Sequence, residues 1–259
     1  MPFANLPDMK LHYEISGAEH LPVVVFSNGL GTTMRMWERQ VEAFSKYFRV
    51  LRCDTRGHGQ SGVTPGPYTI EQLSWDVVGL LDALGIERAH FCGLSMGGLI
   101  GMFLGTNAGG RFHKIALCDT AAKIGTNDSW NTRIQAVQSG GMKAISAGVI
   151  ERWLTANFRA SHPEETQSIQ SMLEAANPKG YIACCAALRD VDLRNTIGTI
   201  RNPCLALTGT HDTTSPPEEA HFLERSIPGA AYAEISAAHL SNVEARDEFN
   251  RHVLRFLLA

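Results

Sequence analysis

The chain has 259 residues, of which 44% are hydrophobic, and it carries a formal net charge of -3 with an isoelectric point near 6.4. This size and composition fit one α/β domain with an insertion as well as two domains, and we favour the first. The mildly acidic balance gives no sign of the clustered Lys and Arg that nucleic acids and anionic membranes need. The start lacks the charged and apolar regions of a signal peptide, and no apolar run is long enough to cross a bilayer, so we expect a cytoplasmic protein that binds neither nucleic acid nor membrane.

Short apolar runs with β propensity alternate with helical periodicity along most of the chain. The strand-like runs are residues 9–15, 22–27, 48–54, 90–93, 114–119, 204–209 and 231–235. A helix is predicted after the third run, because Thr69 to Gln72 resembles a capping box, an apolar stripe follows, and Gly85 marks the stop. The alternation predicts an α/β fold with a mainly parallel, twisted sheet and helices on both faces.

A serine between two glycines follows the strand-like run at 90–93. The segment from Gly93 to Gly97 reads Gly-Leu-Ser-Met-Gly, with Ser95 at its centre. In a nucleophile elbow, a strand enters a helix through a strained turn that raises the serine hydroxyl above the sheet edge, and small residues on both sides allow that turn. A structural glycine turn is the alternative, so the rest of the chain decides.

The pattern changes from Lys123 to about Arg194, where strand-like runs disappear. Helical segments are predicted at residues 129–137, 142–154, 164–176 and 180–189. We interpret residues 123–194 as a helical cap inserted into a core made of residues 1–122 and 195–259.

The two strand-like runs after the cap end in candidates for a catalytic acid and base. A serine nucleophile needs a base, and the base needs a carboxylate that fixes its tautomer; in the α/β-hydrolase order these follow as Ser, acid, His. Asp212 lies just beyond the run at 204–209, and His239 lies on the loop after 231–235. Because the carboxyl ends of parallel strands share one sheet edge, Ser95, Asp212 and His239 are predicted to meet there.

Each of these assignments has an alternative. Asp119 ends the run after the elbow and is a rival acid, although a turn or capping role is favoured for it. His58 precedes the serine and is interpreted as a turn residue, and His211 beside the acid is interpreted as incidental.

Acyl transfer also requires donors for the developing oxyanion. We predict the backbone amides of Met96, directly after the nucleophile, and of Leu30, in the loop that follows the run at 22–27. Asn28 occupies a position where many such enzymes carry His, so the loop departs from the usual pattern at one residue.

Neither the cysteines nor the histidines indicate a metal or a disulfide. Most of the 6 cysteines fall in strand-like runs, no Cys-x-x-Cys pair is present, and Cys184 and Cys185 are adjacent in a helical stretch. The 10 histidines show no ligand-like spacing. We expect buried free thiols, no metal and no cofactor.

Five segments together resemble the 3-oxoadipate enol-lactonases, a family within the α/β-hydrolases. They are DTRGHG at 54–59, AHFCGLSMGG at 89–98, TAAKIG at 120–125, GYIACCAALRD at 180–190 and AAHLSN at 237–242. The first is shared widely across the superfamily, whereas the cap segments and the last run are more specific. The resemblance extends nearly end to end and implies an α/β-hydrolase fold and hydrolysis of a five-membered enol-lactone to 3-oxoadipate in aromatic-acid breakdown.

The substrate implied by this resemblance has a free carboxylate, which needs a cationic partner. Trp130 and Arg133 are spaced i and i+3, share one face of the first cap helix and are predicted to contact the substrate. The alternative is a solvated Arg and a Trp that packs the cap on the core. Lys123, Arg152 and Arg189 are weaker candidates.

Other functions are known on the same fold and remain alternatives. They are a general carboxylesterase, a C–C bond hydrolase, a perhydrolase, and a ligand receptor that keeps the fold without turnover. A serine at the elbow argues against dehalogenases and epoxide hydrolases, which use aspartate there. The sequence does not decide whether the chain forms a homo-oligomer.

Overall fold

The computed structural model describes residues 2–259, and its centre is one eight-stranded sheet. The strand order is β1-β2-β4-β3-β5-β6-β7-β8. The strands are β1 (Phe3–Asn5), β2 (Lys10–Ser16), β3 (Val23–Ser27), β4 (Arg49–Cys53), β5 (Ala89–Leu94), β6 (Phe112–Cys118), β7 (Cys204–Gly209) and β8 (Ala231–Ile235). β1 and β2 are antiparallel to their neighbours and all other pairs are parallel, as the alternating pattern predicted.

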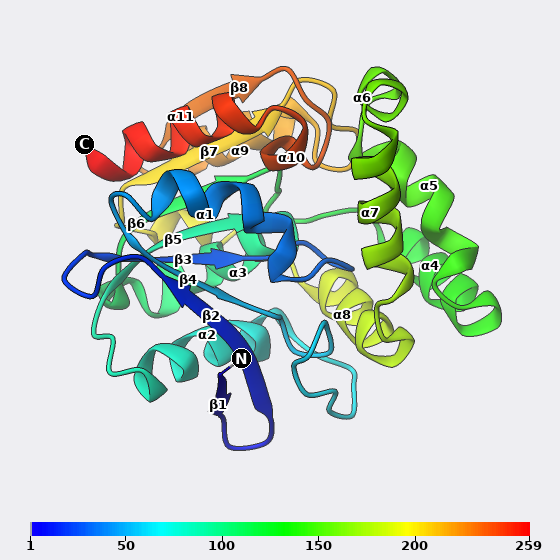
Figure 1. Ribbon diagram of the computed structural model, residues 1–259, viewed down its shortest axis with the longest axis horizontal. Helices are drawn as coiled ribbons and strands as arrows, with labels where there is room; N and C mark the ends of the chain where they lie inside the picture. The colour runs from blue at the N-terminus through cyan, green and yellow to red at the C-terminus, as the bar shows by residue number, and fades with distance from the viewer. Residues whose placement is uncertain (1) are drawn as a thin grey trace.

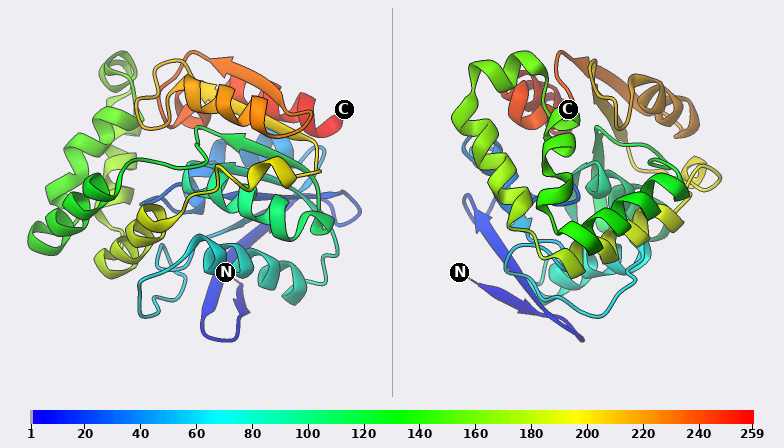
Figure 2. Two further views of the ribbon diagram at one scale, coloured as in Figure 1. Left: turned by 180° about the vertical axis from the view of Figure 1, so that it is seen from behind. Right: turned by 90° about the vertical axis from the view of Figure 1, so that its right-hand side faces the viewer.

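Helices cover both faces of this sheet, so the central strands are buried on both sides. One face carries α1 (Glu38–Phe44) and α11 (Arg246–Leu258), and the other carries α2 (Ile70–Ala83), α3 (Met96–Asn107) and α9 (Pro217–Ser226), as Figures 1 and 2 show. Short helical turns complete the core: η1 (Met34–Trp37), η2 (Gly109–Arg111), η3 (Ile197–Thr199) and α10 (Ser241–Glu244). Val24, Val25 and Phe26 of β3 are fully buried, which fits an apolar central strand.

The predicted helix after β4 begins and ends at the predicted signals. Thr69 accepts a hydrogen bond from the Gln72 amide at 3.0 Å, and Gly85 has the positive φ of a helix stop. Buried residues on its inner stripe include Leu73, Leu80 and Leu81. This helix therefore packs against the sheet beside α3.

All the chain between β6 and β7 is helical or irregular. It contains α4 (Asn127–Gly140), α5 (Lys143–Trp153), α6 (Ala156–Ser161), α7 (Pro163–Glu174) and α8 (Pro178–Asp190), which gather beyond one end of the sheet in Figure 1. The short helix α6 and the three-residue strand β1 were not predicted, because neither is long enough to show a periodic apolar pattern. The helices α1, α9 and α10 were not predicted either, whereas the predicted strands and the predicted helices between β6 and β7 differ from the observed ones by a few residues.

Across residues 2–259, no helix combines the length and the apolarity that a bilayer span would need.

Candidate active site

The turn between β5 and α3 has the strained geometry expected of an elbow. Ser95 has φ 57° and ψ -114°, a region that side-chain-bearing residues rarely adopt. A Cβ on Gly93 would overlap the Gly97 carbonyl, and a Cβ on Gly97 would overlap the Ser27 carbonyl. Glycine is therefore required on both sides of Ser95 by close backbone contacts.

Hydrogen bonds from β6 hold this strained turn in place. The Ser95 amide donates to the Cys118 carbonyl at 2.9 Å, and the Thr120 hydroxyl donates to the Ser95 carbonyl at 2.7 Å. Both backbone polar groups of the serine are thus occupied by neighbours, so the geometry of the turn is fixed by the core.

Asp212 and His239 form a buried hydrogen-bonded pair at the carboxyl ends of β7 and β8. His239 Nδ1 lies 2.7 Å from Asp212 Oδ2, and both residues are 2% exposed. The other carboxylate oxygen accepts the amides of Thr214 at 2.7 Å and Ser215 at 3.1 Å. Because Asp212 engages Nδ1, the imidazole keeps Nε2 for a proton from another group.

Asp119, the rival acid, is hydrogen-bonded elsewhere. Its carboxylate accepts the Gly209 amide at 2.8 Å and the Ser241 hydroxyl, so it joins the ends of β6 and β7 to the loop after His239. Burial first, and then the neighbouring charge of Asp212, raise the pKa of Asp119 well above its usual range. These hydrogen bonds engage both oxygens of Asp119 away from His239, which suits a structural role.

The loop between β3 and η1 carries the predicted oxyanion donor Leu30, and His58 holds this loop. The Gly31 amide, next in the chain after Leu30, donates to His58 Nε2 at 3.0 Å. His58 is buried, and this burial lowers its pKa, so its ring stays neutral and able to accept. The interpretation of His58 as a mere turn residue missed this contact.

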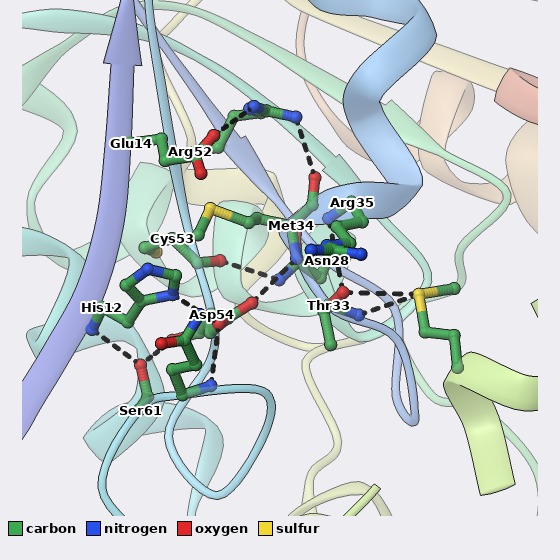
Figure 3. A network of polar contacts seen from close by, with 12 residues as sticks. His12, Glu14, Asn28, Thr33, Met34, Arg35, Arg52, Cys53, Asp54 and Ser61 are labelled. Carbon is green, nitrogen blue, oxygen red and sulfur yellow. Dashed lines mark hydrogen bonds and ion pairs between the residues drawn. The ribbon is translucent and has the colours of Figure 1, made fainter. Parts of the chain in front are cut away.

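Asp54 supports the same loop from its other end. Figure 3 shows its carboxylate between η1, β2 and the turn that follows β4: Oδ1 accepts the Met34 amide at 3.0 Å, and Oδ2 lies 2.8 Å from His12 Nδ1. Asn28 donates to the Cys53 carbonyl at 2.8 Å and accepts from Trp37 Nε1 at 3.0 Å. Asn28 therefore anchors the loop, and the widely shared 54–59 segment acts as its scaffold.

A small cavity brings together most of the predicted site residues. Leu30, Ser95, Trp130, Arg133 and His239 all line it, whereas Met96 and Asp212 lie behind the surface. The lining also includes residues that were not predicted: Ile124, Trp153, Tyr181, Leu188 and Thr214. Its volume is about 20 Å³, which is room for about one water molecule.

The wall that α4 contributes to this cavity is cationic and aromatic. The guanidinium of Arg133 lies 5.2 Å from the centre of the Trp130 ring, and Trp130 Nε1 donates to the Ile124 carbonyl at 2.7 Å. Within residues 2–259, Arg133 and Arg152 form no ion pair with a carboxylate. Burial, and then the charge of Arg133, lower the pKa of Arg152. The two positive groups are therefore close to one another, and neither forms an ion pair with a carboxylate in the described part of the chain.

The two remaining cationic candidates have partners outside the cavity. Lys123 pairs with Asp192 at 3.5 Å, and Arg189 pairs with Asp190 at 2.7 Å. Neither lines the cavity beside Ser95.

A larger groove of about 1180 Å³ lies between η1, α1 and α7, and its lining includes neither Ser95 nor His239. In this groove the Thr33 hydroxyl contacts the Met172 sulfur at 3.4 Å, which joins the loop after β3 to α7. The groove separates α7 from η1 and α1.

No group of three His, Cys, Asp or Glu side chains in residues 2–259 is arranged to hold a metal ion. All cysteines are free and buried. Burial raises the pKa of Cys53, Cys185 and Cys204 to about 12, so these thiols are poor nucleophiles.

A parallel sheet that delivers a strained serine, an aspartate-bound histidine and a donor loop to one edge is the architecture of the α/β-hydrolases. A family model described as alpha/beta hydrolase fold matches residues 22–142. Two curated proteins from Acinetobacter baylyi, 3-oxoadipate enol-lactonase 1 and 3-oxoadipate enol-lactonase 2, are 39% and 38% identical, and each match covers 95% of this chain and 92% of the relative. The crystal structure of the enol-lactonase from Burkholderia xenovorans is 44% identical, with a TM-score of 0.98 over 100% of both chains. The chain belongs to the 3-oxoadipate enol-lactonase family of α/β-hydrolases.

Proposed function

We propose that this enzyme hydrolyses 3-oxoadipate enol-lactone to 3-oxoadipate, with Ser95 as nucleophile, His239 as general base and Asp212 as the acid that orients it. One observation supports this most directly: Ser95 and His239 line the same cavity as the Arg133 guanidinium, which has no carboxylate ion pair within residues 2–259, while His239 Nδ1 lies 2.7 Å from the Asp212 carboxylate. The names of the curated relatives support the choice of lactone.

The first half of the proposed reaction opens the ring. His239 Nε2 takes the proton of Ser95 Oγ as that oxygen attacks the lactone carbonyl carbon, and Asp212 stabilises the imidazolium. The amides of Leu30 and Met96 donate to the developing oxyanion. The ring C–O bond then breaks, and the leaving enol oxygen takes the proton from His239 and becomes a ketone by tautomerisation. An enol oxygen is less basic than an alkoxide, so this protonation is undemanding.

The second half of the reaction releases the product from Ser95. A water molecule gives a proton to His239 as it attacks the acyl-enzyme carbonyl, the same two amides bind the oxyanion, and His239 returns the proton to Ser95 Oγ. The fixed hydrogen bond between His239 Nδ1 and Asp212 suits a base that accepts and donates twice per turnover.

We propose that Arg133 binds the free carboxylate of the substrate. A guanidinium that faces the cavity without a protein carboxylate, beside a second cationic group at Arg152, attracts an anion. The Trp130 ring, whose N–H is already bonded to Ile124, offers only its apolar surface to the substrate. This assignment favours a lactone that bears a carboxylate over a neutral ester.

Residues 123–194 are proposed as a cap that moves over a core of residues 1–122 and 195–259. A cavity of about 20 Å³ is too small for a five-membered ring with a carboxymethyl group. The lactone can reach Ser95 only after helices such as α4, α5 and α8 shift away from the sheet edge. The proposed substrate is a small molecule and the proposed compartment is the cytoplasm.

Freshly generated enol-lactone is the direct test, with loss of its ultraviolet absorbance as the readout and a simple aryl ester alongside. The proposal expects the lactone to have the higher kcat/KM. A preference for the aryl ester would instead indicate a general carboxylesterase. Covalent labelling of Ser95 by a fluorophosphonate, lost in His239→Ala, separates an enzyme from a receptor that keeps the fold without turnover.

A further inference from the structure

Glu244, the last residue of α10, contacts the loop that carries His239. One of its carboxylate oxygens, Oε2, accepts the amide of Ala238 at 3.0 Å. Ala238 directly precedes the histidine, so this contact fixes the backbone on one side of the proposed base. The Glu244 amide in turn donates to the Leu240 carbonyl at 3.0 Å, which closes the loop around His239.

The same carboxylate also contacts the cap. Glu244 Oε2 accepts the amide of Thr155 at 3.2 Å, and Oε1 accepts the Thr155 hydroxyl. Thr155 is the N-cap of α6, where its hydroxyl oxygen also accepts the Phe158 amide at 3.2 Å. A single side chain therefore joins the start of α6 to the residue before His239.

A second contact joins this loop to the cap on the other side of His239. The Leu240 amide donates to the carbonyl of Trp153, the last residue of α5, at 2.9 Å. Trp153 also lines the cavity beside Ser95. The residues before and after the proposed base are thus both held by the segment that links α5 to α6.

We propose that Glu244 is a positioning residue that makes the orientation of His239 depend on whether the cap is docked. This inference rests on the proposed role of His239 as the base. When the cap shifts to admit the lactone, Thr155 and Trp153 move away and the histidine loop loses supports on both sides. When the cap returns, Glu244 bridges Thr155 and Ala238 again, and the imidazole regains its position in the wall of the cavity beside Ser95. Proton transfer is thereby reserved for the docked state, which excludes bulk solvent from the cavity but leaves space for the single water molecule that hydrolyses the acyl-enzyme.

Three variants and one control test this coupling. Glu244→Ala removes all three contacts, Glu244→Gln keeps oxygen and amide groups of similar size, and Thr155→Val removes only the hydroxyl on the cap side. Glu165→Gln is the matched control, because Glu165 makes another contact between cap and core, a 3.9 Å pair with Arg246, without touching the histidine loop. Rates are divided by the concentration of active sites titrated with a fluorophosphonate, so that loss of folded protein is not counted as loss of rate.

We expect kcat per titrated site to fall about 100-fold in Glu244→Ala, because a displacement of about 1 Å at a catalytic group can cost that much. Glu244→Gln should retain about ten times more activity than Glu244→Ala, Thr155→Val should lose about threefold, and KM should change by less than about twofold in all of them. The rate of Ser95 phosphonylation should fall in parallel with kcat, since it uses the same base. Glu165→Gln should match the wild type.

Two results would overturn the inference. If Glu244→Ala kept the wild-type kcat per titrated site and lost only thermal stability, Glu244 would be merely structural. If Glu244→Ala lowered kcat while Thr155→Val did not, the dependence on the cap would be wrong. The rates of phosphonylation and of aryl-ester hydrolysis can be measured even if the lactone proves not to be the substrate. Failure of the proposed function is therefore distinguished from failure of this inference.

Discussion

Replacement of His58 by leucine tests how the oxyanion loop is held. His58 Nε2 is the acceptor for the Gly31 amide at 3.0 Å, and the side chain is 1% exposed. Leucine fills similar space but accepts no hydrogen bond, so the Gly31 N–H is left unpaired in the interior. The neighbouring amide of Leu30 is the proposed donor to the oxyanion, and a loop that relaxes to satisfy Gly31 carries Leu30 with it.

The size of the effect follows from these two amides. An unpaired buried N–H costs about 1–3 kcal/mol of folding free energy. If the loop moves to relieve that cost, loss of the Leu30 donor costs about 2.7–4 kcal/mol in the transition state, or about 100-fold to 1000-fold in kcat. His58→Gln restores an acceptor at similar reach. It should therefore recover part of the lost folding free energy and part of the lost kcat.

The assay pairs urea unfolding with kcat and KM for the enol-lactone, measured for His58→Leu and His58→Gln. We expect the leucine variant to lose more than the glutamine variant in both stability and kcat, with little change in KM. Equal kcat in both variants and the wild type, despite lower stability, would refute the link between His58 and the oxyanion donor.

The wild-type enzyme supplies an independent check, because protonation of His58 also removes the acceptor. Burial lowers the pKa of this residue, so its contribution to stability is complete above about pH 6.5 and is lost as the pH falls toward the lower folded pKa.

Three further predictions concern the triad, the cap and the far end of the sheet. Asp212→Asn should keep the fold and lower kcat by about 10⁴-fold, because the imidazole loses the carboxylate that sets its tautomer; a loss under about tenfold would show that Asp212 does not orient His239. Arg133→Ala should raise KM for the enol-lactone by about 10-fold to 100-fold, because a charge-assisted hydrogen bond to the substrate is lost. KM for a neutral aryl ester should not change. An unchanged KM for the lactone would show that Arg133 does not bind the substrate. Burial and the nearby charges of His113 and Lys114 lower the pKa of His90 to about 4, so between about pH 6.5 and that value the unfolded chain binds a proton that the folded chain does not. The free energy of unfolding should therefore fall as the pH is lowered across this window. Urea titrations at several pH values should show a smaller decrease in His90→Asn than in the wild type. The same dependence on pH in both proteins would contradict this.

The parts of the fold and site that lie within one short stretch of chain could be predicted from the sequence. Gly93 and Gly97 predicted the strained turn at Ser95, because only glycine tolerates the backbone contacts there. Asp212 and His239 could be placed because parallel strands bring their carboxyl ends to one edge. The hydrogen bond between them joins residues 27 positions apart, and their residue types, their order in the chain and their positions after parallel strands predicted that they would lie close together.

The parts that depend on tertiary packing could not be predicted. His58 and Gly31 are 27 positions apart, and Thr155 and Glu244 are 89 positions apart, with no periodic pattern that relates either pair. Tyr181 lines the cavity because α8 packs across the site, and the only hint was its place in the 180–190 segment that resembles the enol-lactonases. Contacts between helices of the cap and loops of the core require the assembled structure.

The most direct measurement is the initial rate of absorbance loss of 3-oxoadipate enol-lactone with the wild-type enzyme and with Ser95→Ala, beside an aryl ester under the same conditions. We expect a higher kcat/KM for the lactone than for the aryl ester and loss of both activities in Ser95→Ala. A higher kcat/KM for the aryl ester, or lactone turnover that survives in Ser95→Ala, would contradict it.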